Sequence, residues 1–189
     1  MKIDRNLNLV FPVERAEGVA YVHCTPVGML VFEHHFLAIS KTFSALIENG
    51  GEWLLRMGPR VAKMMLKKVS ETDRSWDEIE RGFLVEIRRL TNVVMPLETG
   101  WTNIPLQEAV DKGYFSDEDL SEVENAVVFF TVCCASMKKK EANALTEAIA
   151  GLLDGQATSF NVTDFQRSLP TSTPEGNIGA KAKASSIPR

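Results

Sequence analysis

SDEDLSEVENAVVFFTVCCASM, residues 116–137, contains the longest apolar run of the chain, at 126–135. Its apolar side chains recur at alternating spacings of three and four residues, which is typical of one face of an α-helix. They are Leu120, Val123, Val127, Phe130, Cys134 and Met137. Ser116 and Asp119 have the spacing of a helix N-cap, and the acidic residues at 117–119 suit the positive end of a helix. We therefore predict a buried central helix with Val127 and Phe130 in the core.

A buried strand is the alternative for residues 127–134, because this segment is rich in β-branched and aromatic side chains. The helical spacing continues on both sides of the segment, and its start is well capped. Both observations favour the helix.

The segments that precede the central helix have the same helical period. Five apolar residues, spaced for one helix face, predict a helix that ends at 49–51: Phe32, Phe36, Ile39, Phe43 and Leu46. Pro59 suits the first turn of a second helix through Val69, with the following side chains inward: Val61, Met64, Met65 and Val69. Ser75 and Glu78 have the spacing of a capping box. They predict a third helix that continues past Val94 and is stopped by Pro96.

Residues 96–104 are predicted to be a connector that contains Gly100 and Trp101. Further helices are expected at 105–112 and 142–153. One last short turn, capped around Thr163 to Gln166, is expected before Pro170.

The two ends of the chain differ from this helical body. Residues 7–11 and 19–23 alternate apolar and polar side chains around the turn Ala16-Glu17-Gly18, which predicts a β-hairpin with Pro12 at a strand end or edge. Residues 170–189 contain three prolines and no aromatic residue, which predicts a flexible tail. The expected fold is mainly α, with about five to seven helices. The expected parts are a hairpin segment at 1–28, a helical body at 29–169 and the tail at 170–189.

Composition limits the function classes. The 189 residues carry a net charge of −4, whereas nucleic-acid-binding proteins usually have a basic balance, so no nucleic-acid partner is expected. No apolar run approaches the length of a membrane span, and residues 1–15 lack the pattern of a signal peptide. Three cysteines without regular spacing indicate a reducing cytoplasm, not a disulfide framework.

No motif predicts catalysis, a metal site or a bound cofactor. Neighbouring residues of a helix point about 100° apart, so His34-His35 is not expected to chelate one metal ion. The pair Cys133-Cys134 lies in an apolar run and is expected to pack in the core, and Cys24 beside His23 lacks the context of a nucleophile. The acidic residues at 117–124 lack the EF-hand pattern. Three basic clusters are expected on solvated faces: Lys67-Lys68, Arg88-Arg89 and Lys138 to Lys140.

Four stretches resemble the tail assembly chaperones of long, non-contractile-tailed (siphovirus-type) bacteriophages. They are KMMLKKV (63–69), EIRRLTNVVMP (86–96), EVENAVVFFTVCCASMKKK (122–140) and TSFNVTDFQRSLPTSTPEGNIGA (158–180). The similarity lies in packing and tail patterns, and it carries over no individual binding residue.

The resemblance implies a non-enzymatic protein that coats the hydrophobic, helical tape measure protein in the host cytoplasm before the tail tube polymerises. It also implies a longer form made by ribosomal frameshifting, for which the C-terminal tail would lead to the extension. The partner is then a protein with apolar helices, and self-association is a further possibility. The alternative is a structural subunit of the virion, in the tail or the head–tail connector.

Overall fold

The computed structural model describes residues 7–48, 51–73, 75–98, 100–135 and 139–170. Its fold is α+β, so the prediction of a mainly α protein was wrong. Within the described residues, five antiparallel strands form one sheet in the order β4-β3-β2-β1-β5. The strands are β1 (Asn8–Arg15), β2 (Gly18–Cys24), β3 (Thr91–Leu97), β4 (Gly100–Pro105) and β5 (Gln156–Thr158).

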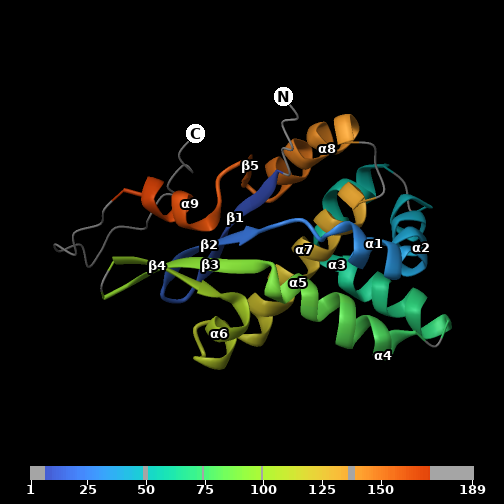
Figure 1. Ribbon diagram of the computed structural model, residues 1–189, viewed down its shortest axis with the longest axis horizontal. Coiled ribbons are helices and arrows are strands. Elements are labelled where there is room, and N and C mark those ends of the chain that lie inside the picture. The colour runs from blue at the N-terminus through green and yellow to red at the C-terminus, as the bar shows by residue number, and fades with distance from the viewer. Residues whose placement is uncertain (1–6, 49–50, 74, 99, 136–138, 171–189) are drawn as a thin grey trace.

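All helices of the described residues lie between β2 and β3 or after β4. They are α1 (Met29–His34), α2 (Phe36–Glu48), α3 (Gly51–Thr72), α4 (Trp76–Glu78), the π-helix η1 (Ile79–Leu84), α5 (Val85–Arg89), α6 (Leu106–Asp111), α7 (Asp117–Ala135), α8 (Lys139–Leu152) and α9 (Val162–Ser168). Figure 1 shows the sheet at one side of the molecule, α1, α2 and α4 at the opposite side, and α5 leading back to the end of β3.

The hairpin β3–β4 is the largest error of the sequence prediction. The predicted third helix ends at Arg89, and Leu90 to Thr91 turns the chain into a strand that pairs with β2. Val94, expected on that helix, lies opposite Tyr21 in the sheet. The apolar spacing of the helix continues by coincidence into the strand, whose β-branched residues favour extended backbone. The predicted connector is mostly β4, which opens at Gly100 with a φ of 101°.

The N-terminal hairpin is confirmed. β1 and β2 pair from Leu9 opposite Cys24 to Arg15 opposite Gly18. Pro12 lies within β1, but β5 pairs only with Asn8 to Val10, so Pro12 has no second neighbouring strand among the described residues. This is the edge position expected for a proline.

Both faces of the sheet are covered, because alternate strand residues enter different apolar clusters. Leu9, Phe11 and Val22 point into the main core with α3, α5 and α7. On the other face, a smaller cluster packs under α9: Val10, Tyr21, Val94, Phe165 and Leu169. The period of two places consecutive side chains on opposite faces of the sheet.

The predicted central helix is confirmed as α7. Val127 and Phe130 are buried, and every residue from Val123 to Cys133 is buried. A helix segment that is apolar nearly all round, as Ala126 to Cys133 is except for Thr131, belongs in the interior. Its cap is also as predicted: the Asp119 backbone N–H donates to Ser116 Oγ at 3.1 Å, and the Ser116 N–H donates to the Asp119 carboxylate at 2.9 Å.

Other helix boundaries differ from the prediction. Pro59 lies inside α3, not in its first turn, and Met64 is exposed, not inward. Ser75 makes no side-chain cap, so the predicted capping box with Glu78 is wrong. The short helix before Pro170 is present, but its cap is Asn161, which accepts from the Asp164 N–H at 2.9 Å. The predicted flexible tail lies outside the described residues from position 171 onward.

Candidate functional site

Four large apolar side chains are exposed at the starts of α1 and α2. Met29, Leu30, Phe36 and Leu37, which we call the α1–α2 apolar surface, are between 54% and 81% exposed. Scattered single apolar residues are common on protein surfaces, whereas a contiguous group indicates a contact site. These four lie within nine consecutive positions. Figure 1 shows both helices at the end of the molecule farthest from β4.

α1 is held on the body by few contacts. None of its residues is fully buried, although Val31 and Phe32 pack partly against the core. The Phe32 ring meets the Phe36 ring edge to face at 5.7 Å between centroids. Met29 and Leu30 are exposed, so only two of the four apolar side chains of α1 pack against the rest of the fold.

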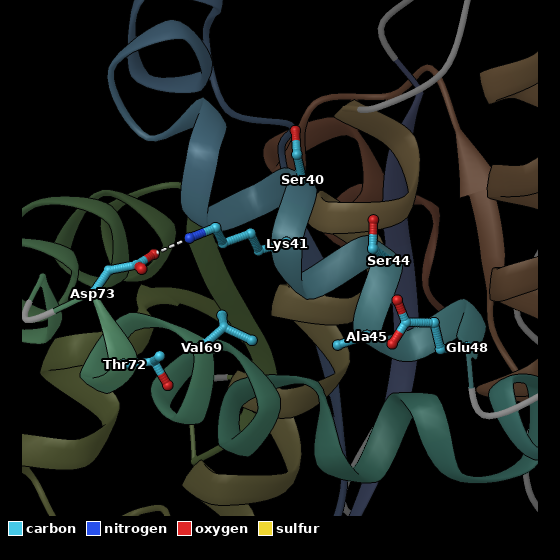
Figure 2. A pocket seen from close by; sticks show the side chains of 8 residues that line it. All are labelled: Ser40, Lys41, Ser44, Ala45, Glu48, Val69, Thr72 and Asp73. Atoms are coloured by element: carbon cyan, nitrogen blue, oxygen red, sulfur yellow. Dashed lines mark hydrogen bonds and ion pairs between the residues drawn. The ribbon is translucent and has the colours of Figure 1, made fainter.

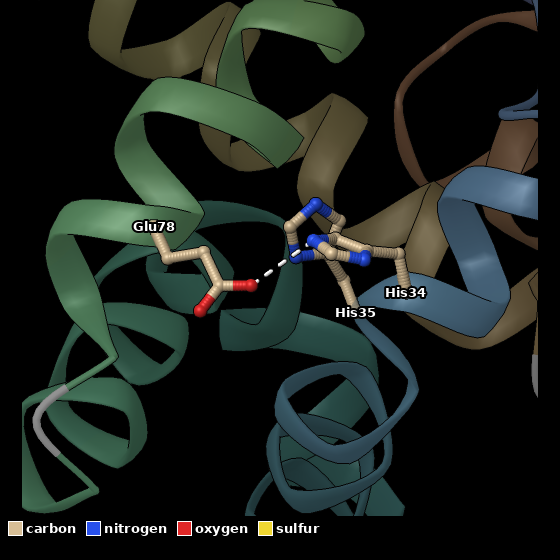
Figure 3. Close-up of side chains that lie close together, drawn as sticks. All are labelled: His34, His35 and Glu78. Carbon is tan, nitrogen blue, oxygen red and sulfur yellow. Dashed lines mark ion pairs between the residues drawn. The ribbon is translucent and has the colours of Figure 1, made fainter.

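His34 and His35 lie beside this surface and come together with Glu78. The expectation that the two rings diverge assumed a continuous helix, but α1 ends at His34, and His35 has a φ of −104° and a ψ of 15°. Their ring centroids are 4.6 Å apart, and His34 Nε2 lies 3.0 Å from Glu78 Oε1. Figure 3 shows the histidines from one segment facing the carboxylate from α4. One ligand atom from each residue lies within 4.8 Å of the others.

The π-helix η1 makes room for His35. A Cβ atom on Gly82 would lie 3.0 Å from His35 Nε2, so the His35 ring packs closely against the η1 backbone at this glycine. The surrounding hollow, about 500 Å³ in volume, is also lined by Asp77 and Arg81. Burial and the neighbouring His34 lower the pKa of His35, so its ring is neutral at pH 7. π-helical turns frequently occur at functional sites.

A second hollow, of about 400 Å³, lies between α2 and α3. Figure 2 shows Lys41 of α2 reaching Asp73 at the end of α3, where the two side chains form an ion pair. Ser40, Ser44 and Glu48 line the α2 side. The hollow is open, and its ion pair already satisfies two of its charged groups.

Glu124 is buried, which the sequence did not indicate. Its carboxylate is 2% exposed and pairs with Lys63 of α3 and with Arg88 of α5, the latter at 2.6 Å. The next residue, Asn125, accepts a hydrogen bond from the Lys63 N–H at 3.0 Å. The pair Arg88-Arg89 is therefore not simply a solvated face. Glu124 joins three helices around the core.

Cys24, Cys133 and His23 lie in the interior, and Cys134 is partly buried at the edge of the core. Cys24 and Cys133 are buried, and burial raises the pKa of each thiol to about 12. Burial also raises the pKa of Cys134 to about 11. A thiol with such a pKa has almost no thiolate at neutral pH and is a weak nucleophile. His23 is buried, and its Nε2 lies 3.1 Å from the Phe160 carbonyl oxygen.

The basic clusters lie mainly in intramolecular pairs. Arg89 is bidentate with Glu86 at 2.7 Å, and Lys67 lies over the Trp76 ring at 5.4 Å. The side chains of the cluster at 138–140 lie outside what the structure describes.

No family model, curated protein or solved structure matches this chain. Among the helices of the described residues, none combines the length and apolar character needed to cross a membrane.

Proposed function

We propose that this chain is a non-enzymatic assembly chaperone that binds an apolar helical partner through the α1–α2 apolar surface. The observation that supports the proposal best is the exposure of Met29 and Leu30 at the start of α1 and of Phe36 and Leu37 at the start of α2. Their burial in a complex would remove apolar area from water, which is the main favourable term in protein association.

The shape of this surface suits a helix as its partner. α1 and α2 meet at a corner, and an apolar helix can lay its own stripe across such a pair of helices. Leu30, Phe36 and Leu37 supply apolar area that a partner can bury, and the unbranched Met29 side chain adapts to different partner shapes. A chaperone that covers many segments of one partner needs this kind of tolerant contact.

The partner class follows from the sequence resemblance to phage tail assembly chaperones. On this proposal, the partner is a tape measure protein, whose apolar helical faces would aggregate if left bare. Binding would take place in the host cytoplasm. The same surface could pair two copies of the chain before the partner binds.

Co-expression tests the proposal. The chain should raise the soluble fraction of the tape measure protein encoded downstream, and the two should elute together on gel filtration. Unchanged precipitation without a joint peak would count against it.

A structural role in the virion is the competing proposal, because the hairpin and the C-terminal tail could lace neighbouring subunits. Mass spectrometry of purified particles separates the two roles. A chaperone should be depleted from mature particles, whereas a structural subunit should be present in stoichiometric copies.

A further inference from the structure

We propose that His34, His35 and Glu78 form a binding site for a divalent transition-metal ion of the zinc class, which clamps the end of α1 to α4. This inference is independent of the proposed partner, since it concerns three side chains of the chain itself.

The geometry brings suitable ligands to one place. His34 Nε2 and Glu78 Oε1 are 3.0 Å apart, near the separation of about 3.3 Å that tetrahedral zinc requires between two ligands at its usual bond lengths. One ring nitrogen of His35 lies within 4.8 Å of a ligand atom of His34 and of a ligand atom of Glu78. Small side-chain rotations therefore suffice to close three ligands around one ion. Two imidazoles and one carboxylate are a common zinc set, with a fourth position left for water.

The backbone supports this arrangement from two directions. The end of α1 between His34 and His35 turns the two rings toward one point, edge to face. On the opposite side, the His35 ring lies close against Gly82, where an added Cβ atom would be 3.0 Å from His35 Nε2, so the η1 backbone limits where the ring can move. Glu78 is the last residue of α4 and precedes the π-helix directly.

The charges around the hollow are compatible with a cation. Asp77 and Glu78 contribute carboxylates, and Arg81 contributes one opposing positive charge. Glu78 is about 60% exposed and His34 about 65%, so an ion has access from solvent without opening the fold. Imidazole selects zinc, nickel or copper over magnesium, which prefers oxygen ligands.

A bound ion would change how firmly α1 is held. In the described structure, α1 is attached by partial packing of Val31 and Phe32 and by the contact of His34 with Glu78. Replacing that contact with metal–ligand bonds would fix the end of α1 next to Phe36 and Leu37. Metal binding should therefore order the helix that carries half of the α1–α2 apolar surface.

Isothermal titration of the full chain, without a histidine tag, tests the proposal with Zn²⁺, Ni²⁺ and Mg²⁺. We expect one Zn²⁺ per chain, Ni²⁺ binding at the same site and no Mg²⁺ binding. His34→Gln, His35→Gln and Glu78→Gln should each weaken Zn²⁺ binding at least about tenfold. Even the loss of a residue that only hydrogen-bonds to a metal ligand lowers metal affinity by this much. Glu80→Gln is the matched control, since it removes the same charge from an exposed position two residues further along, and it should bind as the wild type does.

Nitrogen NMR of the wild-type imidazoles gives a readout that needs no variant. Zn²⁺ should shift the ring nitrogens of His34 and His35 and leave those of the buried His23 in place. The absence of Zn²⁺ binding would overturn the proposal. So would Zn²⁺ binding that all three variants retain, or binding that leaves the His34 and His35 signals unmoved. If His35→Gln fails to fold, the wild-type spectra decide the outcome.

Discussion

Glu124 is the residue whose environment departs furthest from its sequence context. It follows several exposed acids in the first turns of α7, and nothing in its spacing distinguishes it from Glu122. In the structure, Glu122 is exposed, whereas Glu124 is buried between Lys63 and Arg88. Its partners are 61 and 36 positions away in the chain. Pairing at such separations depends on tertiary packing and leaves no local pattern to detect.

Glu124→Gln should lower the free energy of unfolding by about 3 kcal/mol, near the lower end of the range for breaking a buried ion pair. The lower end applies because Lys63 and Arg88 are partly exposed and can be solvated. Urea denaturation measures the change. Glu122→Gln is the matched control, with an expected change within about 0.5 kcal/mol. Equal effects of the two substitutions would contradict the buried network.

The buried His23 side chain should make the free energy of unfolding depend on pH. Burial lowers its pKa in the folded chain below the usual value of 6.5. The unfolded chain therefore binds more protons as the pH falls below about 6.5, so stability is present above that pH and is lost below it. Denaturation at pH 7.5 and at pH 5.5 should show this loss. His23→Gln keeps a donor for the Phe160 carbonyl and should reduce the difference between the two pH values; an undiminished difference would refute the assignment to His23.

α3 and α7 cross in close contact at Gly58, which lies against the Phe129 ring. A Cβ atom on Gly58 would lie 2.4 Å from the buried Phe129 ring, so α3 approaches α7 at a point that admits no side chain. Sequence reasoning identified α7 from its period and its cap, because both are local. It did not predict that α3 begins at Gly51, since Pro59 suggested a later start.

Gly58→Ala should destabilise the fold by about 1–3 kcal/mol through overpacking, although alanine favours helix more than glycine does. Thermal unfolding followed by circular dichroism shows whether Gly58→Ala lowers or raises the melting temperature. Gly151→Ala, in α8, is the control, because no atom of the described residues lies within 4 Å of the added Cβ atom. That substitution should be neutral or stabilising by up to about 1 kcal/mol. A stabilising Gly58→Ala would show that the helices are farther apart than described.

At the scale of the whole molecule, the sequence predicted the N-terminal hairpin and most helices, but not the sheet. β2 pairs with β3 across the segment that holds α1 to α5, and β1 pairs with β5 near the other end of the chain. β3 was missed because its apolar residues continue the spacing of the helix before it. β5 was missed because it is only three residues long. The His34-His35-Glu78 cluster was hidden for a related reason, because it requires a helix break and a carboxylate from another helix.

The α1–α2 apolar surface is expected to bind an apolar helical partner. Co-purification of the tape measure protein with wild-type chain, Phe36→Ser, Leu30→Ser and Phe160→Ser tests it most directly. Phe160 is the matched control, an exposed phenylalanine between β5 and α9, 46% exposed against 54% for Phe36. Phe36→Ser and Leu30→Ser should reduce the co-purified partner at least about tenfold, the effect of losing roughly 1.4 kcal/mol, while Phe160→Ser retains it. Equal recovery with folded Phe36→Ser, Leu30→Ser and wild-type chains would contradict the claim.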